Sequence, residues 1–432
     1  MAKVTFNIDR CKGCNLCVEA CPKKILALSH DELNAKGFHP VEIIDESRCI
    51  GCGFCATMCP EAAITVEKEG RAEISAAMEK VLMKGNEAMA EAAIIAGCRF
   101  FFGYPITPQT EVAAYMAKRM LEVGGVNLQA ESELAAISMV MGASSTGVRV
   151  MTSSSSPGIS LMGEGISYLA GCDLPALLIN VQRAGPGLGG IQPAQSDYFQ
   201  ATRSMAHGDF HIISLAPNSV QEMADLTMKA FDLADQYRMQ VMILADAILG
   251  QMMEPVILRD AEKKKLPEKT WAVTGTGGRR KKNIINSLYL SVEELDKVNR
   301  ERFARYKIVE EKETLFEEYM TDDAEIVMAA YGATSRICKN AIATARTKGI
   351  KVGLIRPITL WPFPKKAFQK VAQRAKAFLC VEMSMGQMID DIRLAVGGSK
   401  RVAFCGRVGG MVPSPEEILE KLEQLNGGGV NA

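Results

Sequence analysis

A doubled cysteine run near the start of the chain limits its possible folds more than any other feature. The first copy occupies residues 11–22, with four Cys followed by Pro22, and the same spacing returns before Pro60. In such runs three thiolates bind one [4Fe–4S] cube and the fourth Cys ligates the other cube. The spacing therefore predicts two clusters, the first held by Cys11, Cys14, Cys17 and Cys59 and the second by Cys49, Cys52, Cys55 and Cys21.

Zinc knuckles and disulfides are the alternatives for these cysteines. Zinc sites seldom combine three Cys at two-residue spacing with a final Cys-Pro, and the doubled pattern argues against chance. The other cysteines are odd in number and each lies in or beside an apolar run, which indicates buried reduced thiols: Cys98, Cys172, Cys338, Cys380 and Cys405. Clusters and free thiols together indicate a reducing cytoplasm.

Length and charge set further bounds. A chain of 432 residues with 48% hydrophobic residues is typical of a globular protein of about three domains. The formal net charge is +0, which implies neither a nucleic-acid partner nor a membrane surface. We expect no signal peptide and no membrane span, because no uncharged apolar run is long enough.

The order of patterns divides the chain into five segments. After the ferredoxin unit and a charged linker, apolar strands alternate with helices, which predicts an α/β fold with a parallel sheet covered on both faces. A charged connecting arm, whose basic run Arg279–Lys282 is interpreted as solvated charge rather than a phosphate site, leads to a second, smaller α/β domain. The predicted segments are 1–70 (ferredoxin unit), 71–82 (linker), 83–255 (first α/β domain), 256–322 (arm) and 323–432 (second α/β domain).

Single segments give more specific expectations. Ser219 with Glu222 predicts the start of a helix. The segment Ser29–Pro40, between the two cysteine runs, is longer and more polar than cube-binding turns need, and it is interpreted as a surface loop without an assigned role. The predicted strands of the two α/β domains are Arg99–Phe102, Val126–Gln129, Arg149–Thr152, Ala176–Val181, His211–Leu215, Gln240–Leu244, Ile326–Ala330, Lys351–Ile355, Ala377–Val381 and Arg401–Cys405.

Two loops at the carboxyl ends of these strands carry candidate ligand groups, since open α/β sheets bind ligands at that edge. Thr107 is predicted to cap a helix that begins at Pro108, and such a helix start suits a carboxylate, although a plain cap is the alternative. Glu133 is predicted in the first turn of a helix that is apolar almost all round and hence buried. A buried carboxylate needs a donor, which makes Glu133 a candidate for acid–base work as well as a helix-dipole complement.

The third loop follows the strand Ala176–Val181. Gly185, Gly187 and Gly190 formally match a dinucleotide fingerprint, but no helical periodicity follows and no acidic partner lies about twenty residues on. Arg183, at the strand end, is interpreted instead as an anion-facing group.

At these residues a family becomes recognisable. Four motifs resemble the α subunit of 2-oxoacid:ferredoxin oxidoreductases: residues 103–108 (GYPITP), 129–136 (QAESELAA), 155–160 (SSPGIS) and 182–186 (QRAGP). The N-terminal unit resembles that family's two-cluster δ subunit, so the chain looks like a δ–α fusion. Its sequence is most similar to the members of the family that act on branched-chain substrates (2-oxoisovalerate), and the 2-oxoglutarate members are the alternative.

The resemblance implies a cofactor and its partners. The family binds thiamine diphosphate with Mg²⁺ between two α/β domains, and the Gly-Asp-Gly and Asn-Asn motif for the diphosphate is absent from this sequence. The chain is therefore expected to supply the pyrimidine side and a transketolase C-terminal-like domain, with a β subunit supplying the rest and a γ subunit also expected. By the same resemblance, Glu133 (or Glu131) hydrogen-bonds the pyrimidine ring, and Thr107 and Arg183 face the substrate.

The activity implied is oxidative decarboxylation of a 2-oxoacid with coenzyme A to acyl-CoA and CO₂, with electrons passing through the two clusters to ferredoxin. Two hypotheses of other classes stay open at this point. One is a non-catalytic electron-relay or scaffold subunit, and the other is a flavin- or nicotinamide-linked reductase resting on Gly185–Gly190.

Overall fold

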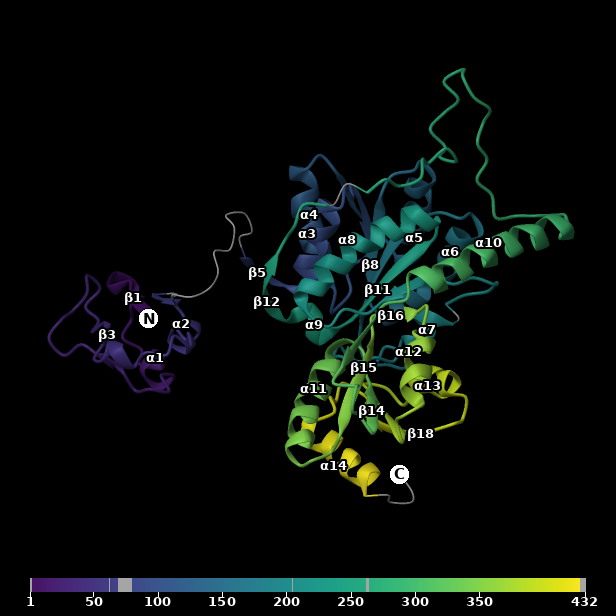
Figure 1. Cartoon of the computed structure of the whole chain (residues 1–432). Helices are drawn as coiled ribbons and strands as arrows, with labels where there is room; N and C mark the ends of the chain where they lie inside the picture. The colour runs from purple at the N-terminus through teal and green to yellow at the C-terminus, as the bar shows by residue number, and fades with distance from the viewer. Residues whose placement is uncertain (1, 62, 69–79, 204, 262–263, 428–432) are drawn as a thin grey trace. The chain divides into compact units, whose positions relative to one another are not determined.

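The computed structural model describes residues 2–61, 63–68, 80–203, 205–261 and 264–427. The chain divides into two compact units, Met1–Met78 and Glu79–Ala432, which are considered separately (Figure 1). Most of the linker predicted over 71–82 lies outside the described residues. The part within them is not a linker, because strand β5 begins at Lys80 and pairs along its whole length with β12 (Met253–Ile257).

The first unit is a two-fold repeat around the cysteines. In each copy a short 3₁₀ turn (Ile8–Arg10 or Glu46–Arg48) precedes the first Cys, and a one-turn helix, α1 (Leu16–Glu19) or α2 (Phe54–Thr57), carries the third. Two antiparallel pairs flank the repeat: β1 (Ala2–Phe6) with β4 (Ile64–Lys68), and β2 (Leu26–Leu28) with β3 (Val41–Ile43). The small apolar core is therefore built directly around the thiols.

The second unit is organised on a central sheet of seven strands among the described residues. All neighbours run parallel except one edge strand, which confirms the predicted parallel sheet. In sheet order the strands are β16 (Thr359–Trp361), β10 (Ile213–Leu215), β11 (Gln240–Asp246), β9 (Ala176–Gln182), β8 (Val150–Ser154), β6 (Phe100–Gly103) and β7 (Val126–Gln129). The strands predicted in this domain are all present, and β16 is a further strand that was not predicted.

Helices cover both faces of this sheet (Figure 1). On one face pack α3 (Gly85–Ile95), α4 (Thr110–Glu122) and α8 (Val220–Tyr237). On the other pack α5 (Glu133–Ser145) and α6 (Ser156–Gly171). The predicted start of α8 is confirmed, because Ser219 Oγ accepts the Glu222 N–H at 3.1 Å.

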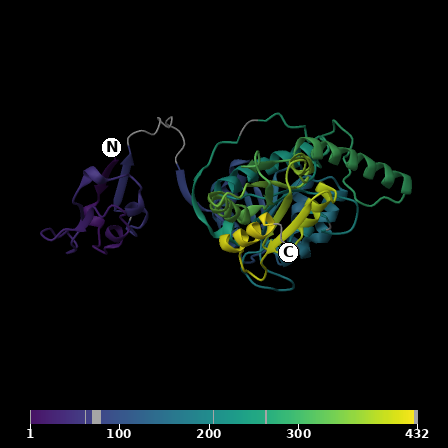
Figure 2. The ribbon, with the colours of Figure 1, turned by 60° about the horizontal axis from the view of Figure 1, so that its bottom comes forward.

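A second, five-stranded sheet follows the connecting segment. Its strands, in sheet order, are β13 (Phe316–Tyr319), β15 (Val352–Pro357), β14 (Ile326–Ala329), β17 (Ala377–Glu382) and β18 (Arg401–Gly406). Its helices are α11 (Gly332–Thr347), α12 (Lys365–Ala372), α13 (Met388–Val396) and α14 (Pro415–Asn426). Figures 1 and 2 show α14 beside α11, at the end of this domain that carries the C-terminus.

The predicted arm, residues 256–322, packs against both α/β domains and is not only a surface connection. Its described middle part runs as an extended loop into α10 (Val292–Lys312), where Tyr306 and Val309 are buried (Figures 1 and 2). Lys269 pairs with Asp235 of α8 at 2.6 Å. The arm's last strand, β13, joins the second sheet, while β16, from the predicted second domain, joins the first. The arm therefore contributes an edge strand to the second sheet, and the predicted second domain contributes one to the first.

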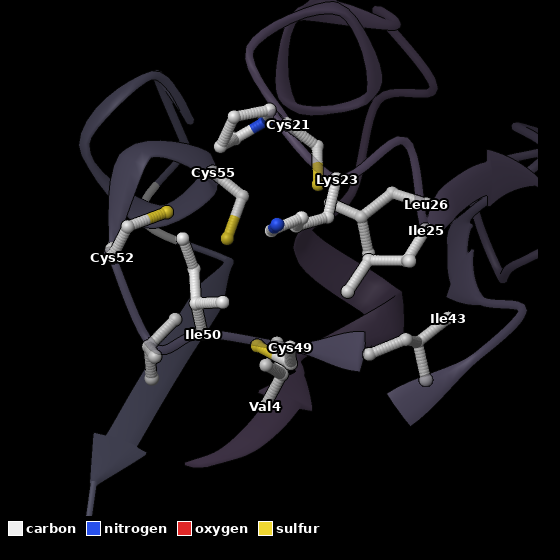
Figure 3. Close-up of a pocket in the computed structure, with 13 residues that line it drawn as sticks. Val4, Cys21, Lys23, Ile25, Leu26, Ile43, Cys49, Ile50, Cys52 and Cys55 are labelled. Atoms are coloured by element: carbon white, nitrogen blue, oxygen red, sulfur yellow. The ribbon is translucent and has the colours of Figure 1, made fainter. Parts of the chain in front are cut away.

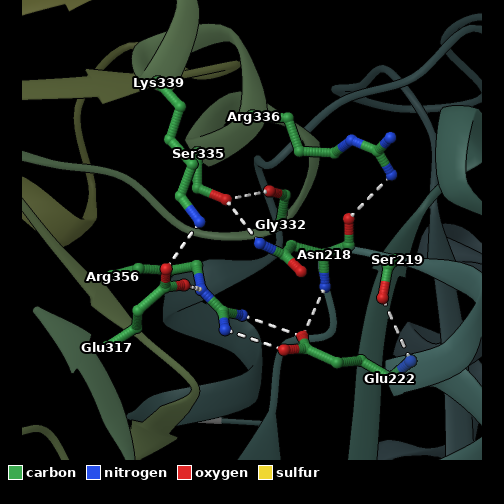
Figure 4. Close-up of polar contacts among 9 residues, drawn as sticks. All are labelled: Asn218, Ser219, Glu222, Glu317, Gly332, Ser335, Arg336, Lys339 and Arg356. Carbon is green, nitrogen blue, oxygen red and sulfur yellow. Dashed lines mark hydrogen bonds and ion pairs between the residues drawn. The ribbon is translucent and has the colours of Figure 1, made fainter. Parts of the chain in front are cut away.

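Buried polar contacts also join the two α/β domains (Figure 4). Arg356 of β15 is 3% exposed and donates two hydrogen bonds to Glu222 of α8, at 2.8 and 2.9 Å. Its Nε donates to Glu317 of β13 at 2.7 Å. A planar guanidinium shared by two carboxylates from separate elements fixes their orientation as well as their distance.

We expect Arg356→Ala to lower the free energy of unfolding by about 3 kcal/mol, because it removes the buried cation that pairs with Glu222 and Glu317, of which Glu317 still pairs with Lys339. Arg336→Ala is the matched control. Arg336 pairs with Glu254 in the same region, but its side chain is 40% exposed, and exposed pairs contribute about 1 kcal/mol or less. Thermal unfolding of both variants measures the difference, and equal shifts would contradict the special role of Arg356.

None of the helices described is both long and apolar enough to cross a membrane.

Candidate active site and iron–sulfur centres

The first unit contains two cavities, each lined by four cysteines. Figure 3 shows the cavity lined by Cys21, Cys49, Cys52 and Cys55. The other is lined by Cys11, Cys14, Cys17 and Cys59. The structure thus brings together the same two sets that the spacing predicts, with the fourth Cys of each run lying at the opposite cavity.

The surroundings of these cavities fit an iron–sulfur cluster. Apolar side chains such as Ile25 and Ile64 line the walls. The Val41 N–H lies 3.4 Å from Cys11 Sγ and the Ala63 N–H lies 3.3 Å from Cys59 Sγ, and such N–H···S contacts tune clusters. Burial raises the pKa of the Cys17 thiol to about 11, so a cationic centre is needed to hold it as a thiolate near neutral pH.

In the second unit, Glu133 is a buried carboxylate without a donor. It opens α5, is 5% exposed, and follows the N-cap Ser132, whose hydroxyl accepts the Ala135 N–H at 3.1 Å. No described residue donates a hydrogen bond to its carboxylate. A Cβ on Gly158 would lie 2.4 Å from Glu133 Oε1, so this glycine of α6 leaves the space that the carboxylate occupies. Glu131, by contrast, is exposed.

Helix α5 is less buried than its composition predicts. Its inner face is buried, but Leu134 is 49% exposed, and the neighbouring edge strand β7 leaves Val126 and Leu128 more than 40% exposed. The prediction of a helix buried all round was wrong because nothing in the described chain covers this side. Edge strands with exposed aliphatic side chains are ready to pair with another chain.

Thr107 does not cap a helix, so this prediction was wrong. Helix α4 begins at Thr110 with Gln109 as its N-cap, because Gln109 is drawn inward and accepts the Ser153 hydroxyl at 2.6 Å. Thr107 is exposed instead and lines a cleft at the carboxyl edge of the sheet. The other residues of the cleft are Pro108, Thr110, Glu111, Ile191, Gln192, Pro193, Ala247, Ile248 and Gln251.

Arg183 forms hydrogen bonds with both loops that follow strands β6 and β9. It is 6% exposed, and its guanidinium donates to the carbonyl oxygens of Thr107 at 3.0 Å and Leu188 at 3.1 Å. Its Nε is buried without a partner in the described part of the chain. The structure therefore brings Arg183 and Thr107 together, whereas neither of them hydrogen-bonds Glu133.

A cluster of polar residues next to the Arg183 backbone was not predicted from the sequence. Ser156 Oγ accepts the Arg183 backbone N–H at 3.0 Å and donates to Asp197 at 2.6 Å. Asn180 donates to the same carboxylate at 2.9 Å, and burial raises the pKa of Asp197. This cluster fixes the end of β9 from which Arg183 projects. The residues come from the start of α6, from β9 and from the residue before α7 (Tyr198–Thr202), and they share no spacing, so the sequence held no signal for the cluster.

Asp246, at the carboxyl end of β11, gives a pH prediction. It is 1% exposed and accepts the N–H groups of Leu249 at 3.1 Å and Ala333 at 3.2 Å, which link α9 (Ala247–Gln251) to α11. Burial raises its pKa from 3.8 to about 6. Because the folded state binds this proton more tightly, its contribution is complete below about pH 4 and is lost as the pH rises through about 6.

We expect this titration to cost roughly 3 kcal/mol of stability between pH 4 and pH 7. Asp246→Asn removes it, so the melting temperature of the variant should fall less steeply over that range than that of the native chain. Parallel pH dependences of the two melting temperatures would show that Asp246 does not titrate there.

Comparisons with known proteins agree with both centres. Residues 91–316, more than half of the chain, match the family described as "Pyruvate flavodoxin/ferredoxin oxidoreductase, thiamine diP-bdg". Residues 324–418 match "Pyruvate:ferredoxin oxidoreductase core domain II", and residues 10–63 match a "4Fe-4S dicluster domain". The chain therefore combines a dicluster iron–sulfur domain with a thiamine diphosphate-binding α/β domain.

Two relatives and one solved structure are informative. Ketoisovalerate oxidoreductase subunit VorB of Methanothermobacter marburgensis is 49% identical over 350 residues, covering 81% of this chain and 99% of that protein. 2-Oxoglutarate synthase subunit KorA of Methanothermobacter thermautotrophicus is 38% identical over 384 residues, again with 81% and 99% coverage. The 2-oxoglutarate:ferredoxin oxidoreductase from Magnetococcus marinus, solved with 2-oxoglutarate, coenzyme A and succinyl-CoA bound, matches with a TM-score of 0.73 and 28% identity over 80% of this chain.

This chain covers 65% of that solved chain. Fold and site together define a thiamine-linked electron-transfer protein. More narrowly, the chain belongs to the 2-oxoacid:ferredoxin oxidoreductase family.

Proposed function

We propose that the chain is the α-type subunit, fused to its own two-cluster ferredoxin domain, of a 2-oxoacid:ferredoxin oxidoreductase. The complex would convert a branched-chain 2-oxoacid of the 2-oxoisovalerate type and coenzyme A to acyl-CoA and CO₂. The choice of branch is supported by 49% identity to a ketoisovalerate oxidoreductase subunit against 38% to a 2-oxoglutarate synthase subunit.

The main support for this proposal is the buried carboxylate of Glu133, to which no described residue donates a hydrogen bond. The ring nitrogen of a bound aminopyrimidine is a suitable partner for this carboxylate. Thiamine diphosphate, when bound, supplies the carbon nucleophile and the electron sink for decarboxylation. Glu133 would hold a proton between its oxygen and the pyrimidine ring, and Gly158 keeps the space beside it free of a side chain. Exposed Glu131 lacks this environment.

Thr107 and Arg183 are proposed to orient the 2-oxoacid. The guanidinium of Arg183 is positioned by two backbone carbonyls and retains a buried Nε without a partner. A buried guanidinium provides a charge-assisted contact for a carboxylate or carbonyl oxygen. The Thr107 hydroxyl, exposed at the mouth of the adjacent cleft, is available to the same ligand.

A partner subunit is proposed to cover the exposed side of α5 and β7. A β subunit would bring the diphosphate half of the cofactor site with its Mg²⁺, because this sequence lacks the diphosphate motif. The exposed Leu134, Leu128 and Val126 mark where a further chain would bury apolar surface beside Glu133. A γ subunit would complete the complex, so the isolated chain is expected to be inactive.

The eight cysteines are proposed as cluster ligands, in the two sets that line the cavities. Each decarboxylation with acyl transfer to coenzyme A releases two electrons, and a one-electron carrier chain must take them singly. The two clusters would receive them in turn and pass them to ferredoxin.

A substrate panel tests the proposal. The assembled complex should be assayed with 2-oxoisovalerate, 2-oxoglutarate and pyruvate side by side, with coenzyme A and ferredoxin. We expect the highest kcat/KM with 2-oxoisovalerate. A preference for 2-oxoglutarate would assign the other branch, and no turnover with any of the three by a complex containing thiamine diphosphate would favour the electron-relay hypothesis.

A further inference from the structure

The loop Ser29–Pro40, which separates the two cysteine runs, is hydrogen-bonded to the turn that carries Cys11. Its centre is Asn34, which is 8% exposed. The Asn34 side-chain amide donates to the carbonyl oxygens of Ile8 at 2.9 Å and Cys11 at 2.7 Å. Its side-chain oxygen accepts the N–H groups of Lys36 at 3.1 Å and Phe38 at 3.0 Å. One side chain therefore both folds the loop and attaches it to the first cysteine turn.

Two further contacts place the end of this loop on the same turn. A Cβ on Gly13 would lie 2.7 Å from the carbonyl oxygen of His39, so the loop backbone packs directly on the turn between Cys11 and Cys14. Just beyond the loop, the Val41 N–H lies 3.4 Å from Cys11 Sγ.

The two cysteine sets differ in burial. In the set next to the loop, Cys11 is 8% exposed and Cys17 is 6% exposed, while Cys59 is half-buried and Cys14 is exposed. In the other set none of the four cysteines is buried: Cys21, Cys49 and Cys55 are half-buried and Cys52 is exposed. The apolar neighbours Ile50 and Phe54 of this second set are 48% and 56% exposed, against 43% for Leu16 beside the first. The set with two buried cysteines is therefore the one that the loop contacts.

We propose that the loop Ser29–Pro40, attached through Asn34, shields the cluster held by Cys11, Cys14, Cys17 and Cys59, so that the two clusters are chemically unequal. The cluster held by Cys21, Cys49, Cys52 and Cys55 is the open one, which meets solvent, oxidants and chelators first. Asn34 acts as a positioning residue for the shielded cluster, since it touches the backbone of a ligand and not the iron. This inference rests on the proposed assignment of the eight cysteines as cluster ligands.

Ordered thiol labelling tests this inequality. The intact complex, purified without oxygen, is exposed to a ferrous-iron chelator, and samples are quenched with iodoacetamide, from which each freed thiolate displaces iodide. Mass spectrometry then locates the modified cysteines of this chain. We expect Cys21 to react together with Cys49, Cys52 and Cys55, about tenfold faster than the other set, which includes Cys59.

Asn34→Asp is the main variant. It keeps the size of the side chain and its bonds to Lys36 and Phe38, but it replaces the donors to Ile8 and Cys11 by an oxygen that repels their carbonyls. Labelling of the Cys11 set should accelerate by roughly tenfold while the Cys49 set is unchanged. A variant purified with only one cluster supports the inference if the labelled cysteines are those of the Cys11 set. Asp31→Ala, an exposed change on the same loop, should label like the native chain.

Equal labelling rates of the two sets in the native complex would overturn the inference, as would an Asn34→Asp variant that is unchanged, accelerates both sets alike or exposes the Cys49 set first. Failure of the cluster assignment itself looks different, because labelling of the eight cysteines would then not depend on the chelator.

Discussion

Replacement of Glu133 by Gln is expected to lower the rate of acyl-CoA formation by roughly a thousandfold. The amide has the size of the carboxylate and fits the same space beside Gly158, but it cannot carry the negative charge that draws a proton from the pyrimidine ring. The exchange keeps the size of the side chain and removes no hydrogen bond that a described residue donates, so the fold should stay intact. The loss should therefore appear in kcat, measured by acyl-CoA formation in the assembled complex, with the iron content unchanged.

The control for this variant is Glu420→Gln, an exposed carboxylate on α14, far along the chain from the site. It should turn over like the native complex. Glu131→Gln distinguishes between the two carboxylates of the loop. If Glu131→Gln were inactive and Glu133→Gln active, the pyrimidine contact would belong to Glu131, and near-normal activity of both variants would remove this loop from the mechanism.

The second large effect is expected from Cys17→Ala. Cys17 is a buried member of the Cys11 set, and a cubane with three protein ligands loses stability and iron. The complex should contain about four fewer iron atoms per chain, and ferredoxin reduction should fall much more than binding of the 2-oxoacid. Iron analysis and carrier reduction, measured on the same preparation, check this expectation.

Cys172→Ala is the matched control, because Cys172 is a half-buried thiol of the second unit that lines neither cavity. It should keep the full iron content and the native rate of ferredoxin reduction. A Cys17→Ala complex that retained all its iron and reduced ferredoxin normally would show that Cys17 is not a ligand.

The parts of the fold with a local signal were predictable from the sequence. Uniformly apolar strands such as β9 and β11 mark a buried parallel sheet, and Ser219 with Glu222 marks a helix start. The cysteine spacing predicts which four thiols meet, since the crossing of the fourth Cys is a property of the repeat and needs no distant contact. Glu133 was a candidate because its helix was predicted to be buried, and a buried carboxylate needs a donor.

The predictions that failed depend on residues distant in sequence. The sequence around Thr107 is typical of a helix cap. The helix begins later, at Thr110, because Gln109 is held by a buried hydrogen bond with Ser153. The edge strands β13 and β16 join sheets on the other side of the predicted boundary because packing between domains decides their pairing. The exposed side of α5 carries the same apolar residue types as its buried side, so composition alone could not distinguish the two.

The central claim is that a carbon–carbon bond is cleaved at a site that Glu133 helps to build and that the electrons leave through this chain's own clusters. Low-temperature electron paramagnetic resonance of the anaerobic complex, after addition of 2-oxoisovalerate and coenzyme A, tests it most directly. The claim predicts reduced [4Fe–4S] signals from the cysteine-bound clusters in step with acyl-CoA, both lost in Glu133→Gln. Acyl-CoA formed without cluster reduction, or no reduction with any 2-oxoacid by a complex with its full iron content, would contradict it.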